Sequence, residues 1–211
     1  MIGFYDYTVY LTYLGFASGV AGVLFAIKDP EHLLPAIICL MFSGLCDMFD
    51  GKVARTKKKR TTEEKHFGIQ LDSLSDLVCF GVLPAVIGYR LGMDKNYLLP
   101  IVIFYPLAAL IRLAYFNVLE IVRNSSTPVK EYIGLPVTSS ALIFPLLYAF
   151  KKILAANFTY VYSFVLLTVG ILFISRIKVK KPRTKTMILF ILLGVIEILL
   201  IFSLKRFVWN I

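Results

Sequence analysis

The chain has 211 residues, of which 58% are hydrophobic and 17% are charged, and its mean hydropathy is +0.78. An ordinary soluble domain is about 45–50% apolar and about 25% charged, so the long apolar blocks of this chain exclude a soluble domain, a disordered chain and a disulfide scaffold. The formal net charge of +10 would suggest nucleic acid as a partner of a soluble protein. No aromatic-basic module accompanies this charge, so we attribute it to basic residues that flank membrane spans.

Seven apolar stretches have the composition of membrane-spanning helices: 8–27, 33–54, 70–92, 97–122, 135–150, 157–175 and 186–204. Backbone groups in lipid must be hydrogen-bonded within the protein, and apolar runs of this length favour helices over the strands of a barrel. The fifth stretch is the shortest and contains Pro136 and Pro145. We therefore expect an all-α, polytopic transmembrane helix bundle.

The basic residues are distributed unequally between the two sides of this bundle. The loops 55–69, 119–134 and 176–185 contain fourteen Lys and Arg residues, whereas the segments on the other side contain six. Because cytoplasmic loops carry an excess of Lys and Arg, this bias predicts that the N-terminus and these three loops face the cytoplasm.

Four of the thirteen acidic residues lie inside or at the edge of the second and third stretches: Asp47, Asp50, Asp72 and Asp76. A carboxylate in a membrane is costly unless it is paired or solvated, and by default it marks a functional site. At about 100° per residue, Asp50 lies about 60° from Asp47 on a helix, and Asp76 lies about 40° from Asp72. Each pair therefore shares one helix face, and two such helices facing each other would form a cage of oxygen ligands.

An all-oxygen cage favours hard divalent cations such as Mg²⁺ or Mn²⁺. Four carboxylates can neutralise two such ions, a pairing suited to phosphoryl displacement. Gly51 and Ala54 fall within about 40° of Asp47, so no bulky side chain obstructs the acids. Two other interpretations remain: the acids could pair with Lys52, Arg55 and loop lysines, or they could be the ion sites of a cation-coupled transporter, although no inverted repeat is visible.

Eight residues with ordered spacing make up the motif around these acids: Asp47-x-x-Asp50-Gly51-x-x-Ala54-Arg55, then Gly68-x-x-x-Asp72-x-x-x-Asp76. The motif resembles the signature of the CDP-alcohol phosphotransferase family. This resemblance implies a six-helix core, usually a homodimer, and two divalent metals in a polar cavity open to the cytoplasm. It also implies transfer of a phosphatidyl-type group from a CDP-linked donor to an alcohol, with release of CMP.

The same resemblance implies roles for individual residues. The four aspartates would be the metal ligands, and Asp76 would also be the base that takes the proton of the acceptor. Four residues would contact the donor, CDP-diacylglycerol: Gly51, Ala54, Arg55 and Thr12. Two departures from the family pattern stand out. Gly15 lies where relatives often have Asn, and residues 56–67 make a spacing of twelve where about eight is usual, which we expect the cytoplasmic loop to absorb.

Three further segments are similar to phosphatidylserine synthases of the bacterial and archaeal membrane type: LDSLSDLVCFGVLPA (71–85), RLAYFN (112–117) and GLPVTSSA (134–141). This similarity implies L-serine as the acceptor. Besides Lys52 and Arg55 of the motif, the basic residues inside the spans are Arg90, near the outer end of its helix, and Arg112. One extra cation suits the single carboxylate of serine better than the phosphate of glycerol 3-phosphate or an inositol phosphate, which are the alternative acceptors.

We expect three residues to be candidate ligands of serine: Arg112, Asn117 and Ser75. Arg112 could instead pair with Glu120, and Asn117 could instead bond to a neighbouring helix.

The family resemblance extends over about residues 8–175. We therefore assign residues 1–175 to the transmembrane core and residues 176–211 to a basic loop and an extra C-terminal apolar segment, whose Glu197 matches nothing in the family pattern. We expect a multi-pass protein of a prokaryotic plasma membrane, with its active site facing the cytoplasm.

Overall fold

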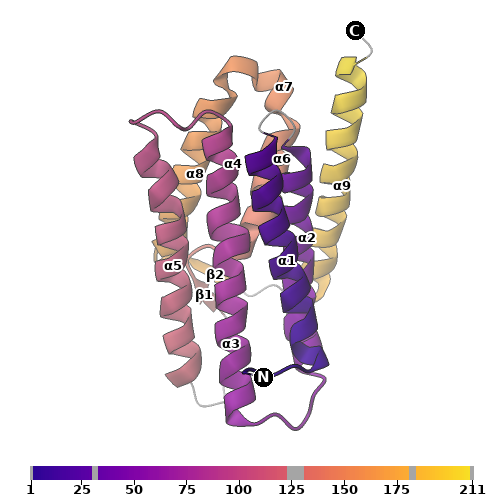
Figure 1. The fold of residues 1–211 in the computed structure, drawn as a ribbon, viewed down its shortest axis with the longest axis vertical. Coiled ribbons are helices and arrows are strands. Elements are labelled where there is room, and N and C mark those ends of the chain that lie inside the picture. The colour runs from indigo at the N-terminus through magenta and orange to yellow at the C-terminus, as the bar shows by residue number, and fades with distance from the viewer. Residues whose placement is uncertain (1, 30–32, 123–130, 181–183, 210–211) are drawn as a thin grey trace.

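The computed structural model describes residues 2–29, 33–122, 131–180 and 184–209, and its long helices run roughly along one axis (Figure 1). The elements in chain order are α1 (Tyr7–Lys28), α2 (Leu34–Ala54), α3 (Thr62–Asp76), η1 (Leu77–Val82), α4 (Leu83–Arg90), α5 (Leu99–Val122), β1 (Glu131–Ile133), η2 (Val137–Ser139), α6 (Ser140–Ala149), α7 (Lys151–Leu154), η3 (Ala155–Asn157), α8 (Phe158–Ile174), β2 (Lys178–Lys180) and α9 (Thr184–Trp209). Five helical stretches in the described residues are long and apolar enough to cross a membrane, and two shorter apolar helices accompany them. The predicted all-α transmembrane bundle is confirmed.

The third predicted stretch differs from expectation at its start. Its helix begins at Thr62 rather than near residue 70, and it continues through η1 and α4 to Arg90. The cause is a capping box at Thr61, whose side chain accepts a hydrogen bond from the Glu64 N–H while the Glu64 carboxylate accepts one from the Thr61 N–H. Much of the extra spacing before Gly68 is therefore helix and not loop, which the Thr-x-x-Glu pattern could have indicated.

Close packing of α1 explains the unusual glycine in the first span. This helix lies along α2 and also contacts α3, η1 and α4. A Cβ at Gly19 would collide with the sulfur of Cys79, and a Cβ at Gly15 would lie 3.0 Å from the Cβ of Cys46. A larger residue at Gly15 would therefore press on the Cβ of Cys46 and require a small shift of α2 relative to α1.

A π-helical segment, η1, interrupts the helix that begins at Thr62. Its last turn is closed by Leu83, whose N–H donates to the carbonyl of Val78, five residues earlier. Such a segment has a wider turn than an α-helix and so changes the direction in which the following side chains point. The polar face of α3 and the apolar face of α4, which buries Leu83 and Ile87, both turn toward the interior of the bundle.

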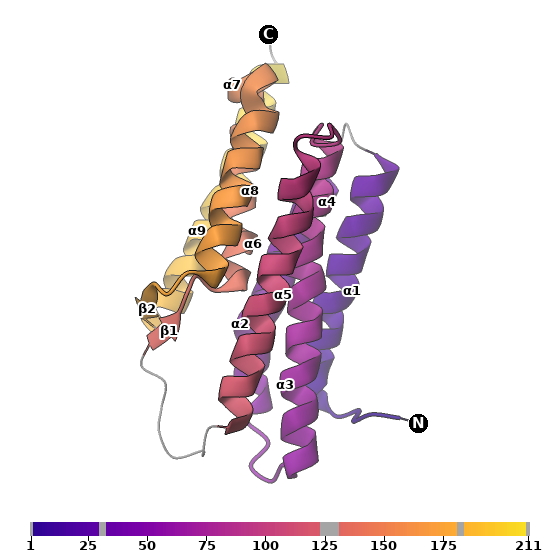
Figure 2. The ribbon, with the colours of Figure 1, turned by 90° about the vertical axis from the view of Figure 1, so that its left-hand side faces the viewer.

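Two short strands, which the sequence did not predict, join distant parts of the chain. β1 pairs with β2 in antiparallel fashion, with Glu131 opposite Lys180. This pairing brings together two of the three basic loops that the charge distribution places on one side. The C-terminal helix α9 packs on α6 and α2 at the edge of the bundle (Figure 2), where it buries Glu197.

Candidate active site

The four intramembrane aspartates converge from two helices. Asp47 and Asp50 lie in the last two turns of α2, and Asp72 and Asp76 lie in the last two turns of α3. Carboxylate oxygens of Asp47, Asp50 and Asp72 lie within 4.8 Å of one another. Asp76 is 8% exposed and lines the same cavity as Asp47 and Asp50. We call these four residues the Asp cluster.

A cavity of about 10 Å³ adjoins the Asp cluster, between α1, α2, α3 and η1. It has room for about one water-sized group. Besides three of the acids, its lining includes the hydroxyls of Thr12, Ser43 and Ser75 and the thiols of Cys46 and Cys79. The polar lining is therefore contributed by every helix that meets at this point.

Hydrogen bonds from α1 and α2 hold the walls of this cavity. Thr12, which the sequence placed at the donor site, donates from Oγ1 to Oδ2 of Asp50 at 2.9 Å. Ser43 donates from Oγ to the Gly15 carbonyl at 2.9 Å, and this bond ties α2 to α1. Sequence reasoning missed Ser43, although it lies four and seven residues before Asp47 and Asp50 and so shares their helix face.

The Asp cluster has the donor set of a divalent-cation site. Within the described ranges, none of its carboxylates forms an ion pair with a Lys or Arg side chain. Lys52 instead lies over the ring of Phe49, with 5.7 Å between Nζ and the ring centroid. Carboxylates held this close repel one another unless a cation or proton lies between them, and oxygen ligands suit Mg²⁺ or Mn²⁺. The residues therefore fit the metals. The alternative of simple pairing with Lys52, Arg55 and loop lysines is not supported by any ion pair among the described residues.

The three motif residues at the end of α2 lie beside the cluster on an accessible surface. Gly51 and Arg55 are exposed and Ala54 is half-buried. The Arg55 side chain folds back along the helix, and its Nη2 is 4.0 Å from the position that a Cβ on Gly51 would occupy. A guanidinium next to bare backbone can bind phosphate oxygens with two parallel hydrogen bonds, as the resemblance implies for the donor.

The three candidate serine ligands are not brought together. Ser75 lines the cavity of the Asp cluster. Asn117 accepts a hydrogen bond from Ser73 at 2.7 Å and donates to the side-chain oxygen of Gln70 at 3.2 Å. It therefore links α5 to α3, which is the helix-linking alternative left open by the sequence.

Arg112 is 7% exposed, and its side chain does not line the described cavity. Its Nη1 donates to the carbonyl of Ile133 at 2.7 Å and to that of Phe173 at 3.4 Å. The guanidinium also lies over the Phe116 ring, 4.5 Å from its centroid. Arg112 therefore connects α5 to β1 and to the C-terminal end of α8, where unpaired carbonyls attract a cation.

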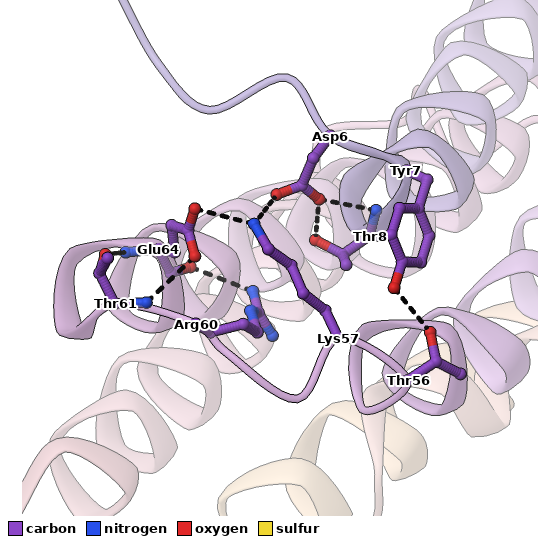
Figure 3. A network of polar contacts seen from close by, with 8 residues as sticks. All are labelled: Asp6, Tyr7, Thr8, Thr56, Lys57, Arg60, Thr61 and Glu64. Atoms are coloured by element: carbon purple, nitrogen blue, oxygen red, sulfur yellow. Dashed lines mark hydrogen bonds and ion pairs between the residues drawn. The ribbon is translucent and has the colours of Figure 1, made fainter.

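A second polar network joins the ends of the three helices that build the cavity (Figure 3). Lys57 bridges Asp6, the N-cap residue of α1, and Glu64 in the first turn of α3, with N–O distances of 2.8 and 2.9 Å. The Tyr7 hydroxyl lies 3.0 Å from Oγ1 of Thr56, just after α2. The network therefore ties α1, α2 and α3 at one end.

The charges in this network reinforce each other. The hydrogen bond from Lys57 lowers the pKa of Asp6 to about 2, and the bonds to Asp6 and Glu64 raise the pKa of Lys57. Because the pKa of Asp6 is depressed from 3.8, its contribution to stability is complete above about pH 4 and is lost as the pH falls through about 2. Exposed ion pairs contribute little energy, so we regard this network as a positioning element.

Comparisons with known proteins agree with the motif. A family model described as CDP-alcohol phosphatidyltransferase matches residues 8–174. The CDP-diacylglycerol–serine O-phosphatidyltransferase of Saccharomyces cerevisiae is 35% identical over 153 residues, which cover 70% of this chain and 54% of that protein. A protein of the same name from Methanocaldococcus jannaschii is 33% identical over 179 residues, covering 85% and 76%. The archaetidylserine synthase of Methanothermobacter thermautotrophicus is 32% identical over 174 residues, covering 80% and 66%. The chain thus spans about half the length of its yeast relative.

Proposed function

The chain belongs to the CDP-alcohol phosphatidyltransferase family, and we propose that it transfers the phosphatidyl group of CDP-diacylglycerol to L-serine, giving phosphatidylserine and CMP. The observation that carries this proposal is the Asp cluster, which brings together four carboxylates at the spacing of the family motif, none of them in an ion pair with a Lys or Arg side chain of the described residues. Relatives named for serine transfer support serine as the acceptor. The runner-up is a sibling reaction with glycerol 3-phosphate or an inositol phosphate.

The Asp cluster is the proposed site of two divalent cations, Mg²⁺ or Mn²⁺. Asp47, Asp50, Asp72 and Asp76 would be the ligands, and Thr12 would hold Asp50 in orientation through its 2.9 Å hydrogen bond. Cations held there would supply positive charge to neutralise a pyrophosphate and to polarise the attacked phosphorus.

The protein's own groups would position the two substrates and move one proton. Arg55, with Gly51 and Ala54, binds the cytidine and pyrophosphate part of the donor. Asp76 accepts the proton of the serine hydroxyl as its oxygen attacks the phosphatidyl phosphorus. The bond from that phosphorus to CMP breaks, and CMP leaves with the electron pair. Ser75 is the proposed serine ligand that lines the cavity.

Acceptor choice is tested with the purified protein, CDP-diacylglycerol, Mg²⁺ or Mn²⁺, and a panel of labelled alcohols. We expect lipid product and CMP with L-serine and little of either with glycerol 3-phosphate. The reason is that the described cavity lining contains no basic side chain that could bind the phosphate of such an acceptor. Turnover of glycerol 3-phosphate without turnover of serine would assign the chain to the sibling reaction.

We also propose the arrangement of the chain in its membrane. Residues 1–175 would form the catalytic core, which the matched range 8–174 supports, and residues 176–211 would add a basic loop and an extra span. The chain would be a homodimer in a prokaryotic plasma membrane, with the cluster facing the cytoplasm.

The orientation is tested by cysteine labelling of intact cells with an impermeant thiol reagent. Lys59→Cys, in the exposed link between α2 and α3, should be labelled only after permeabilisation. Lys95→Cys, in the exposed link between α4 and α5 at the opposite end of the bundle (Figure 1), should be labelled in intact cells. The unsubstituted chain is the control, because Cys39, Cys46 and Cys79 lie within spans. The reverse pattern would invert the topology.

A further inference from the structure

A buried tyrosine holds the π-helical turn next to the Asp cluster. Tyr105, on α5, is fully buried, and its hydroxyl donates to the carbonyl of Phe80 at 3.0 Å. The same hydroxyl lies 2.7 Å from Oγ of Ser140, at the start of α6. Because the tyrosine proton goes to Phe80, Ser140 is the donor in this second bond. The chain of hydrogen bonds therefore connects η1 to two other helices.

The sequence that follows Phe80 removes the α-helical donor of its carbonyl. Four residues later the chain has Pro84, which carries no N–H and cannot close an α-helical hydrogen bond to Phe80. An unpaired carbonyl in a membrane interior is costly. The hydroxyl of Tyr105 donates to this carbonyl in place of the α-helical N–H that Pro84 lacks.

The position of this carbonyl connects it to the proposed chemistry. The π-helical segment begins at Leu77, the residue after Asp76, and Phe80 itself lines the cavity of the Asp cluster. On its other side, Gly81 packs against Pro106 and Ala109 of α5. A change in the winding of η1 would therefore rotate Asp76 relative to the acids of α2. Segments of this kind are often found at functional sites.

We propose that Tyr105 is a positioning residue for the Asp cluster, acting through the Phe80 carbonyl to keep the π-helical turn that orients Asp76. The proposal deepens the proposed function and rests on it for its activity arm. It predicts that the hydroxyl of Tyr105 matters as a substitute for the N–H that Pro84 lacks. If Tyr105 had only a structural role, the loss of any equally buried and hydrogen-bonded tyrosine hydroxyl should have the same effect.

The test compares Tyr105→Phe, Pro84→Ala and the double variant in purified, membrane-reconstituted protein. Tyr105→Phe should lower kcat about tenfold, since a buried acceptor is left without its donor, and should change the KM for CDP-diacylglycerol by less than about threefold. Amide hydrogen exchange in residues 77–84 should become faster, and the affinity for Mn²⁺ should fall. Pro84→Ala supplies a backbone N–H, so the double variant should recover in all three measurements.

Tyr162→Phe is the matched control. Tyr162 is equally buried, and its hydroxyl donates to the carbonyl of Pro84 at 2.9 Å, within the regular helix α4. That carbonyl also has a backbone donor four residues later, so the loss of the hydroxyl leaves it paired. We expect Tyr162→Phe to leave kcat and exchange in residues 77–84 close to wild-type values.

Three results would overturn the proposal: unchanged exchange and kcat in Tyr105→Phe, no recovery in the double variant, or an equal loss in Tyr162→Phe. A failure of the proposed function would look different, because it concerns the wild type. If the wild type used another alcohol than serine, the same comparison would be made with that alcohol. The hydrogen-exchange arm decides the proposal whichever acceptor is used.

Discussion

Replacing Asp76 with Asn is expected to abolish phosphatidyl transfer, with a fall in kcat of at least about 10³-fold, because one substitution removes both a metal ligand and the proposed base. Asp47→Asn, Asp50→Asn and Asp72→Asn should each abolish turnover as well, since each removes one charge from the cluster. Asn keeps the size of the side chain, so the folded protein should remain in the membrane. The measurement is CMP release at saturating Mg²⁺ and Mn²⁺.

The same substitutions that abolish turnover should increase the stability of the protein when a chelator removes divalent ions. Without cations, four carboxylates within one site repel one another, so loss of one charge should raise the melting temperature. Adding Mn²⁺ should stabilise the wild type more than the variants, because ligand binding adds to the stability of the folded state. Asp94→Asn, in the exposed link after α4, is the matched control and should change neither quantity. Near-native turnover in two or more of the cluster variants would refute the metal site.

Arg112→Ala is expected to cause the second large effect. The structure indicates that this effect is a loss of stability and not a loss of serine binding. The sequence indicates a ligand for the serine carboxylate, but the guanidinium bonds to the carbonyls of Ile133 and Phe173. A hydrogen bond from a charged donor contributes about 1.5–3 kcal/mol, so loss of the side chain should lower the free energy of unfolding by about 3 kcal/mol. The melting temperature should fall clearly, and kcat and KM should change as consequences of a loosened α8.

Two comparisons distinguish this outcome from a role in serine binding. Arg112→Lys retains the charge but loses the fork of donors, so it should recover only part of the stability. A serine ligand would behave differently, because its loss would raise the KM for serine about tenfold or more and leave the melting temperature unchanged. That result would return Arg112 to the substrate site.

Several features of this protein follow from local sequence. Hydropathy and length predicted seven apolar helices, because in lipid every backbone group must be hydrogen-bonded within its own helix. In the described residues five of these stretches are long enough to span a membrane, and the two near 135–150 and 186–204 are shorter. The spacing of Asp47 and Asp50, and of Asp72 and Asp76, put each pair on one helix face through the regular turn of 3.6 residues. The capping box at the start of α3 is also a local sequence pattern, Thr61-x-x-Glu64. The prediction that this helix starts near residue 70 did not take it into account.

The partners of the polar groups were decided by tertiary structure alone. Thr12 donates a hydrogen bond to Asp50, which is 38 residues away in the sequence. Tyr105 donates to Phe80, 25 residues away, and Arg112 donates to Phe173, 61 residues away. Periodicity identifies the face on which a side chain lies, but not which other helix packs against that face. That choice depends on how closely the helices approach, as where Gly19 lets α1 lie against Cys79. Buried polar groups must then bond to whatever the packing brings within reach, and so Arg112 bonds to backbone carbonyls.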